Sequence, residues 1–160
     1  MTIFFIQTES PFSRALAGFF TANGDTVTSD PAVSADFFID TTDCRDPGDN
    51  CAVGDGVNAE AAVRSFRANI SEPLDLLSQV LPRMTGKKRV CFLTTRDASV
   101  NWSTATTGYG QNMAKAALHQ ILTITKNGLR EKGFTFSISA SIMSHLVTAS
   151  TLCLERSSGL

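Results

Sequence analysis

Residues 89–94, Arg-Val-Cys-Phe-Leu-Thr, are the segment that decides the fold. This apolar run predicts a buried strand. It lies between two long stretches, residues 59–84 and 109–132, in which apolar residues recur at helical spacing. A strand that alternates with helices on both sides is typical of a parallel sheet. The middle of the chain therefore predicts an α/β fold.

The rest of the chain continues this alternation of strands and helices. Strands are predicted at residues 3–7, 25–28, 36–40 and 134–138. Helices are predicted at residues 13–23, ending at Gly24, and at residues 142–154. We therefore expect a Rossmann-like three-layer αβα sandwich with a reduced, mostly parallel sheet and helices on both faces.

Residues 41–58 are rich in Asp, Gly, Thr and Asn, which predicts a surface loop. The loop contains four acidic residues that are candidate calcium ligands: Asp43, Asp46, Asp49 and Asp55. Their spacing is not that of an EF-hand loop. Turn chemistry alone explains the composition, so a solvated loop is the interpretation we prefer.

The composition indicates one globular domain over residues 1–160, with 42% hydrophobic and 18% charged residues. The formal net charge of -1 gives no attraction to nucleic acid or to acidic membranes, so we expect neither as a partner. The first residues contain no basic leader, and we expect a cytoplasmic location. Four scattered cysteines without a CxxC pair predict no metal site, and Cys91 and Cys153 are expected in the core.

Three segments occur in the order and spacing of the second half of a known enzyme family: Asn69-Ile70-Ser71-Glu72-Pro73-Leu74, the strand at residues 90–95, and Lys115-Ala116-Ala117-Leu118. The chain thus resembles the short-chain dehydrogenase/reductases, best over residues 59–136. The interval between residues 25 and 36 is too short for the usual extra strand and helix. We interpret the chain as a shortened, degenerate member, truncated in its nucleotide-binding half and at its C-terminal end.

The resemblance implies a Ser-Tyr-Lys catalytic set, often with an Asn, and each position has a counterpart here. Lys115 matches the lysine, Asn69 the asparagine and Thr95 the serine. Gln111 stands four residues before Lys115, where the family has its tyrosine, and it has no phenolic proton to donate. Tyr109 precedes Lys115 by six residues, a rotation of about 600° along one helix, so the two side chains are expected on different faces.

The resemblance also implies NAD(P) bound at a turn of pattern TGxxxGxG. Gln7, Pro11 and Ser13 stand at its three glycine positions, and Pro11 lacks an amide donor. The remaining candidate cofactor contacts are Thr8, Ser10 and Ser13. Ser10-Pro11 is also an ordinary cap and first-turn pair for a helix. We therefore expect no cofactor.

Three hypotheses for function follow. The first is a non-catalytic protein that self-associates through helices 59–84 and 109–132, whose counterparts pair as a four-helix bundle in related dimers, or that binds a full-length relative. The second is an atypical NAD(P)-dependent oxidoreductase with the set Tyr109, Thr95, Lys115 and Asn69. The third is a binding module that uses the cleft at the carboxyl ends of the strands, with Trp102 and Tyr109 as contacts.

Overall fold

The computed structural model describes residues 1–6, 10–52 and 54–141. These residues form a five-stranded sheet of order β2-β1-β3-β4-β5, in which each neighbouring pair is parallel. The strands are β1 (Thr2–Ile6), β2 (Thr26–Thr28), β3 (Ala35–Asp40), β4 (Met84–Thr95) and β5 (Thr135–Ser141). The predicted α/β class with a parallel sheet is confirmed. The helix predicted at residues 142–154 lies outside the described residues, as does Cys153.

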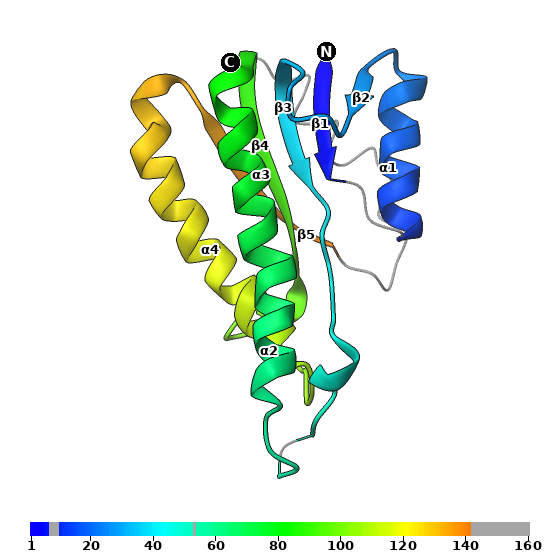
Figure 1. Cartoon of the computed structure of the whole chain (residues 1–160), viewed down its shortest axis with the longest axis vertical. Coiled ribbons are helices and arrows are strands. Elements are labelled where there is room, and N and C mark those ends of the chain that lie inside the picture. Colours follow the sequence, from blue (N-terminus) through cyan, green and yellow to red (C-terminus); the bar gives the residue numbers. More distant parts are fainter. Residues whose placement is uncertain (7–9, 53, 142–160) are drawn as a thin grey trace.

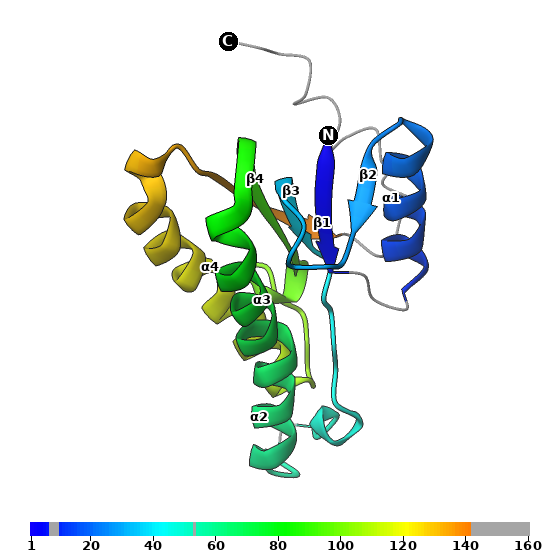
Figure 2. The same ribbon diagram turned by 45° about the horizontal axis from the view of Figure 1, so that its top comes forward.

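Helices cover both faces of the sheet (Figure 1). They are α1 (Pro11–Ala22), α2 (Ala59–Phe66), α3 (Glu72–Val80) and α4 (Tyr109–Leu129). In Figure 2, α1 lies alone beside β2, whereas α2, α3 and α4 are grouped on the other side of the sheet. The predicted three-layer arrangement is therefore confirmed.

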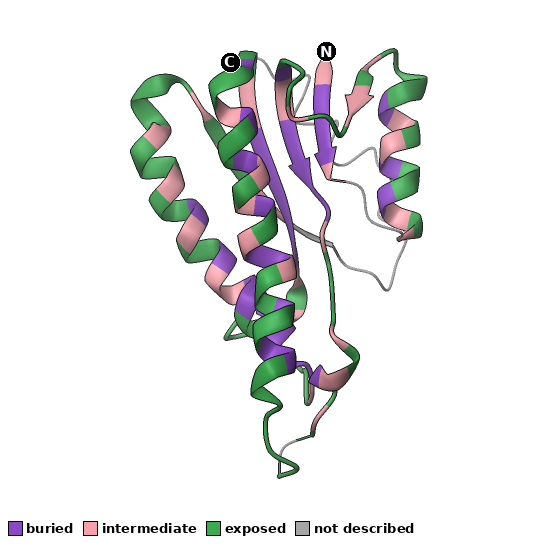
Figure 3. Cartoon of the chain, in the orientation of Figure 1, coloured by how far each residue is buried: buried purple, intermediate pink, exposed green. Residues whose placement is uncertain are grey.

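The two cores follow from the alternation of side chains along the strands. Ile3 and Phe5 pack with Leu16 and Phe20 of α1. Phe4, between them, stacks on Phe38 in the larger core beneath α3 and α4, with 5.4 Å between the ring centroids. Cys91 belongs to the smaller core, as expected. Figure 3 shows the buried residues along β1, β3 and β4 and the helices that are buried on one side.

The predicted single helix over residues 59–84 is wrong in its continuity. A π-helical turn, Arg67–Ser71, separates α2 from α3, and Met84 already belongs to β4. Pro73 lies in the first turn of α3, where its missing N–H and its ring would disturb a regular ladder of hydrogen bonds. The π turn, which lies directly before α3, accommodates this disturbance.

The connection from β2 to β3, residues 29–34, contains no helix and no further strand. This confirms the reduced interval predicted from its length. The strand order reverses at β1, because β2 lies on one side of it and β3 on the other. Open α/β sheets place their ligands at such a switch point, outside the carboxyl ends of the strands. A ligand is therefore expected at this edge of the sheet.

Candidate functional site

A small cavity of about 90 Å³ lies at the carboxyl ends of β3 and β4. Its lining comes from the start of α1, the segment after β3, the end of β4 and the middle of α4: Ser10, Phe12, Thr41, Asp43, Leu93, Thr94 and Lys115. Ligand pockets for small molecules usually measure about 300 Å³ or more. The cavity therefore has room for only a very small ligand.

Lys115 is fully buried, and its ammonium is held by backbone carbonyls. Nζ donates to the carbonyl of Leu93 at 3.0 Å and to the carbonyl of Thr42. Burial lowers the pKa of Lys115, and the charges of Asp40 and Asp43 oppose this effect. Lys115 thus connects α4 to the ends of β3 and β4.

Asp40 ends β3 and is fully buried. Burial raises the pKa of its carboxyl, against the hydrogen bond that Oδ1 accepts from the Thr42 amide at 2.8 Å and the charge of Lys115. Within the described part of the chain, no hydrogen-bond partner exists for Asp40 Oδ2, Thr94 Oγ1 or Thr95 Oγ1. A buried polar atom without a partner costs about 1–3 kcal/mol, so stability alone does not explain these three oxygens.

Ser13 links the first turn of α1 to the residue that follows β3. It is fully buried, and its Oγ lies 2.9 Å from Thr41 Oγ1, which in turn donates to the carbonyl of Ile6 at 2.9 Å. Ser10 caps α1 by accepting from the Ser13 amide at 3.1 Å. The helix therefore begins at Pro11, two residues before the predicted start.

The side chains of Gln111 and Asn69 anchor the segment after β3. Gln111 accepts from Arg45 Nε at 2.7 Å and donates to Asp43 at 2.6 Å. Asn69 donates to the carbonyls of Cys44 and Ser65 at 2.6 and 2.8 Å. It also accepts from the Cys44 amide at 3.0 Å. Both side chains are buried, so this part of the loop is fixed to the π-helical turn Arg67–Ser71 and to α4.

Three comparisons place these features among known proteins. No protein-family profile matches the chain. It is 36% identical over 86 residues to the C-signal protein of Myxococcus xanthus, a match that spans 52% of this chain and 51% of that relative. The chain thus matches about half the length of this relative.

Solved structures extend the likeness to nearly the whole chain. The enoyl-[acyl-carrier-protein] reductase (NADH) of Aquifex aeolicus VF5 has a TM-score of 0.72 at 13% identity, covering 97% of this chain and 85% of its own. A carbonyl reductase of Pseudomonas aeruginosa PAO1 has a TM-score of 0.65 at 18% identity, covering 96% and 77%. A Serratia marcescens short-chain dehydrogenase/reductase has a TM-score of 0.71 at 10% identity, covering 86% and 76%. The chain therefore shares the fold of these reductases and dehydrogenases.

The fold of the short-chain dehydrogenase/reductases implies a bound dinucleotide, and the described residues do not fit one. Pro11 offers no amide to a pyrophosphate, and the Ser13–Thr41 hydrogen bond occupies the place where a glycine would let the phosphate approach. Two of the positions in question, Gln7 and Thr8, lie outside the described residues.

The counterparts of the family's catalytic residues are only partly brought together. Lys115 lines the cavity, and Thr94 lines it in place of its neighbour Thr95, because successive residues of a strand point to opposite faces. Tyr109 is the first residue of α4, on the same continuous helix as Lys115, and is not among the lining residues. Asn69 is engaged with the backbone of Cys44 and Ser65.

Asp49 is the residue that the sequence interpretation misplaced. It was expected in a solvated loop, but it is only 3% exposed. Its carboxylate accepts from the amides of Gly110 and Gln111 at 2.8 and 2.9 Å and from Ser65 Oγ at 3.4 Å. Asp49 therefore caps α4, whose first amides have no partner within the helix. No spacing in the sequence indicates a cap supplied from 61 residues away.

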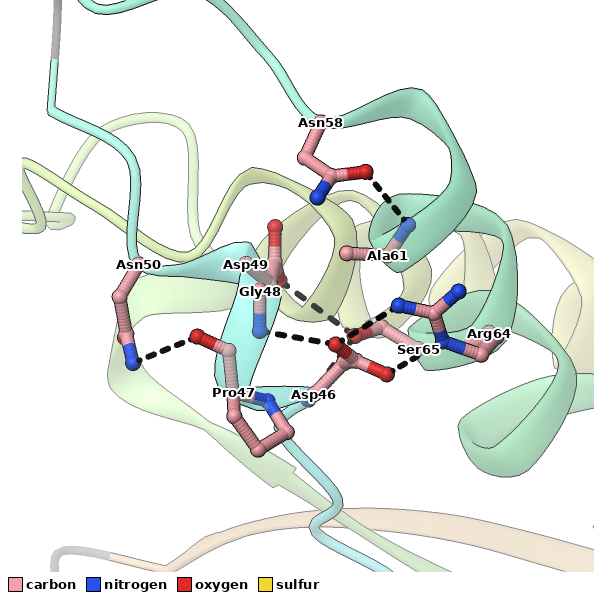
Figure 4. Close-up of polar contacts among 9 residues, drawn as sticks. All are labelled: Asp46, Pro47, Gly48, Asp49, Asn50, Asn58, Ala61, Arg64 and Ser65. Carbon is pink, nitrogen blue, oxygen red and sulfur yellow. Dashed lines mark hydrogen bonds and ion pairs between the residues drawn. The ribbon is translucent and has the colours of Figure 1, made fainter.

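One neighbouring acidic residue of this loop, Asp46, has its own partners (Figure 4). Asp46 accepts from Arg64 Nε at 2.6 Å and from the Gly48 amide at 2.8 Å. These bonds hold the pKa of Asp46 below its ordinary value. In the parts of the chain that the structure describes, no three His, Cys, Asp or Glu side chains are grouped to hold a metal ion. None of the described helices is long and apolar enough to span a membrane.

Proposed function

We propose that this short-chain dehydrogenase/reductase-like chain is a non-catalytic protein that associates with a second copy through the outer faces of α2, α3 and α4. The absence of catalysis is proposed from the identity and the hydrogen bonds of Gln111. It stands at the position of the family's proton donor, and both ends of its amide are engaged with Arg45 and Asp43. An amide in this place has no proton to transfer to a carbonyl substrate.

Exposed apolar side chains on the helices support self-association. Val63 and Phe66 of α2 are 68% and 39% exposed, and Met113 and Ile124 of α4 are 53% and 62% exposed. The same helices cover the sheet with other residues, such as Leu118, which is fully buried. The four exposed apolar side chains therefore do not contribute to the core beneath the helices.

The two helices that carry this apolar set are packed tightly against each other. A side chain at Gly110 of α4 would place Cβ 2.4 Å from the Cα of Ala62 in α2, so the helix backbones are nearly in contact. Neighbouring helices with outward apolar residues form a surface suited to a matching pair of helices from a second copy. Covering a side chain as large as Ile124 contributes about 1.5–3 kcal/mol.

Cofactor titration tests the absence of oxidoreductase activity. We expect the fluorescence of NADH and NADPH to show no saturable change when protein is added, because Pro11 has no amide to donate to a phosphate and Ser13 replaces a glycine beside it. Saturable binding at micromolar concentration, weakened in Lys115→Ala, would contradict the proposal. The variant Gln111→Tyr restores a tyrosine four residues before Lys115, and it too should remain inactive because no cofactor binds.

Light scattering after size exclusion tests the association. The wild-type chain is expected to run as a dimer at micromolar concentration, and Val63→Glu combined with Ile124→Glu should produce monomers. Val100→Glu is the matched control, because Val100 is 95% exposed on the loop before α4 and lies outside the helices. A wild-type monomer, or equal effects of the helix and loop variants, would contradict the proposal.

The alternative is an atypical NAD(P)-dependent oxidoreductase that uses Tyr109, Thr95, Lys115 and Asn69. One observation favours it, since the Thr95 hydroxyl is buried and has no partner among the described residues. A hydroxyl without a partner keeps its capacity to donate a hydrogen bond to a carbonyl oxygen. The same cofactor titration decides between the two functions, because the alternative requires saturable binding of NADH or NADPH.

A further inference from the structure

Positive charge is concentrated at the edge of the sheet where the strands begin. Seven of the chain's 14 Lys and Arg residues lie in two short segments, 83–89 and 126–132. Glu131 is the only acidic residue of these segments, so together they carry a net charge of +6. The first segment leads into β4, and the second ends α4 and the turn after it. Both lie at the top of Figure 1, opposite the loop before α2.

The two segments are in contact, so their Lys and Arg residues form one basic patch. Lys88 Nζ donates to the carbonyl of Lys132 at 3.5 Å and lies 5.3 Å from the centre of the Phe134 ring. Arg89 is paired with Thr135 at the start of β5. Five of the seven cations are exposed, and Lys88 and Arg89 are half-buried. The charge of the patch is therefore presented to its surroundings.

The charges of the basic patch are not balanced within the molecule. None of them forms an ion pair with an acidic residue in the described part of the chain. Asp36 lies beside Gly86, but its Oδ2 accepts from the Thr2 amide at 2.8 Å. Helices α3 and α4 end at this edge, and each helix C-terminus carries about half a negative charge. Two helix ends offset about one of the six charges, so the fold alone does not explain the patch.

A bulge in β4 carries the two adjacent lysines of the patch. Between Ala35 and Phe37, one residue of β3 stands opposite four residues of β4, 85–88. Lys88 has a φ of 44°, in the left-handed region that is unfavourable for a residue with a side chain. Lys87, next to it, is exposed. The chain therefore keeps a strained bulge whose two lysines add to the charge of the patch.

Apolar side chains adjoin the basic patch. Val33 is 38% exposed, and its neighbour Ser34 donates from Oγ to the carbonyl of Arg83 at 2.9 Å. Pro82 is also exposed. The surface of a phospholipid membrane accepts cations beside its phosphates and apolar side chains just beneath them. Nucleic acid offers phosphates without such a boundary, and neither segment of the patch contains an aromatic ring on which an unpaired base could stack.

We propose that the basic patch is a docking surface for a membrane of anionic phospholipids. The chain lies against the membrane with the edge where its strands begin, and the opposite edge of the sheet faces away. The net charge of -1, from which we expected no attraction to acidic membranes, is an average over a molecule whose cations are gathered at one end. Binding of this kind weakens with salt, because the screening length falls from about 10 Å at 0.1 M to about 3 Å at 1 M.

Co-sedimentation with lipid vesicles tests the proposal. The wild-type chain is mixed with vesicles of phosphatidylcholine that contain about 30% phosphatidylserine, and separately with vesicles of pure phosphatidylcholine, at about 0.1 M salt. We expect sedimentation with the anionic vesicles and none with the neutral ones. The partition coefficient should fall at least tenfold when the salt is raised to about 0.5 M.

Two pairs of substitutions locate the binding surface. Lys87→Gln combined with Lys132→Gln removes two exposed charges from the patch. Each cation close to an anionic membrane strengthens binding roughly fivefold, so this pair should weaken binding about thirtyfold. Arg14→Gln combined with Arg96→Gln is the matched control, because it changes the net charge equally. Both arginines are exposed at the opposite edge of the sheet, in the first turn of α1 and directly after β4. The control pair should bind like the wild type.

Three results would overturn the proposal. The first is equal sedimentation of the wild type with anionic and neutral vesicles. The second is equal weakening by the two pairs, since binding would then follow net charge rather than the patch. The third is binding to a fluorescent DNA duplex without binding to the anionic vesicles, which would assign the patch to nucleic acid. Lys87 and Lys132 lie outside α2, α3 and α4, so the comparison of the two pairs does not depend on dimer formation through those helices.

Discussion

Replacement of Asp49 by Ala tests the cap that joins the segment after β3 to α4. The carboxylate accepts from two backbone amides, at 2.8 and 2.9 Å, and is 3% exposed. Its removal leaves both amides without a partner at a buried helix start. Caps are worth about 0.5–2 kcal/mol, and hydrogen bonds to charged groups about 1.5–3 kcal/mol each. We expect a loss of about 3 kcal/mol in the free energy of unfolding, less than the sum because water reaches part of the opened space.

Urea unfolding at one fixed protein concentration measures this loss. With a slope of about 2 kcal/mol per molar urea, the midpoint should fall by about 1.5 M. Asp49→Asn keeps an amide oxygen as one acceptor and should lose about half as much. Asp55→Ala is the control, because Asp55 is exposed in the same loop. A midpoint for Asp49→Ala within experimental error of that for Asp55→Ala would refute the cap.

Three further predictions concern the helices and the buried lysine. Gly110→Ala should lower the melting temperature, because its Cβ would lie 2.4 Å from Ala62 Cα and overpacking costs about 1–3 kcal/mol. Gly128→Ala in the same helix is the control. Its Cβ would meet no atom within 4 Å, so this variant should raise the melting temperature. Asn69→Ala should lose about 3 kcal/mol in urea unfolding, since three hydrogen bonds disappear; a loss below about 1 kcal/mol contradicts this role. The pKa of Lys115 is lowered from 10.5 in the folded chain, so between the lowered value and 10.5 the unfolded chain binds more protons and stability rises with pH. The stability difference between wild type and Lys115→Met should therefore rise over that window, and a flat difference would contradict the burial of the amine.

Local patterns in the sequence were sufficient for the fold class and for much of the element order. The apolar run around Cys91 and the helical spacing before and after it are patterns among neighbouring residues. They can be recognised without knowledge of long-range contacts. The cap at Ser10 was predictable for the same reason, since it follows from the chemistry of the neighbouring residues Ser10 and Pro11. The end of the long helix before Met84 was not predictable from local patterns, because it depends on the pairing of Met84 with Ala35 in the neighbouring strand.

The sequence by itself determined a parallel α/β fold. It also placed Lys115 on the second long helix, with Gln111 in place of a tyrosine four residues earlier. Only the tertiary structure decided what the polar side chains of the site contact. Asp49 reaches an amide 61 residues away, Ser13 a hydroxyl 28 residues away, and Lys115 a carbonyl 73 residues away. The physical reason is that the sheet order brings the ends of β1, β3 and β4 together. Each buried polar group must then find its partner among whatever this arrangement places nearby.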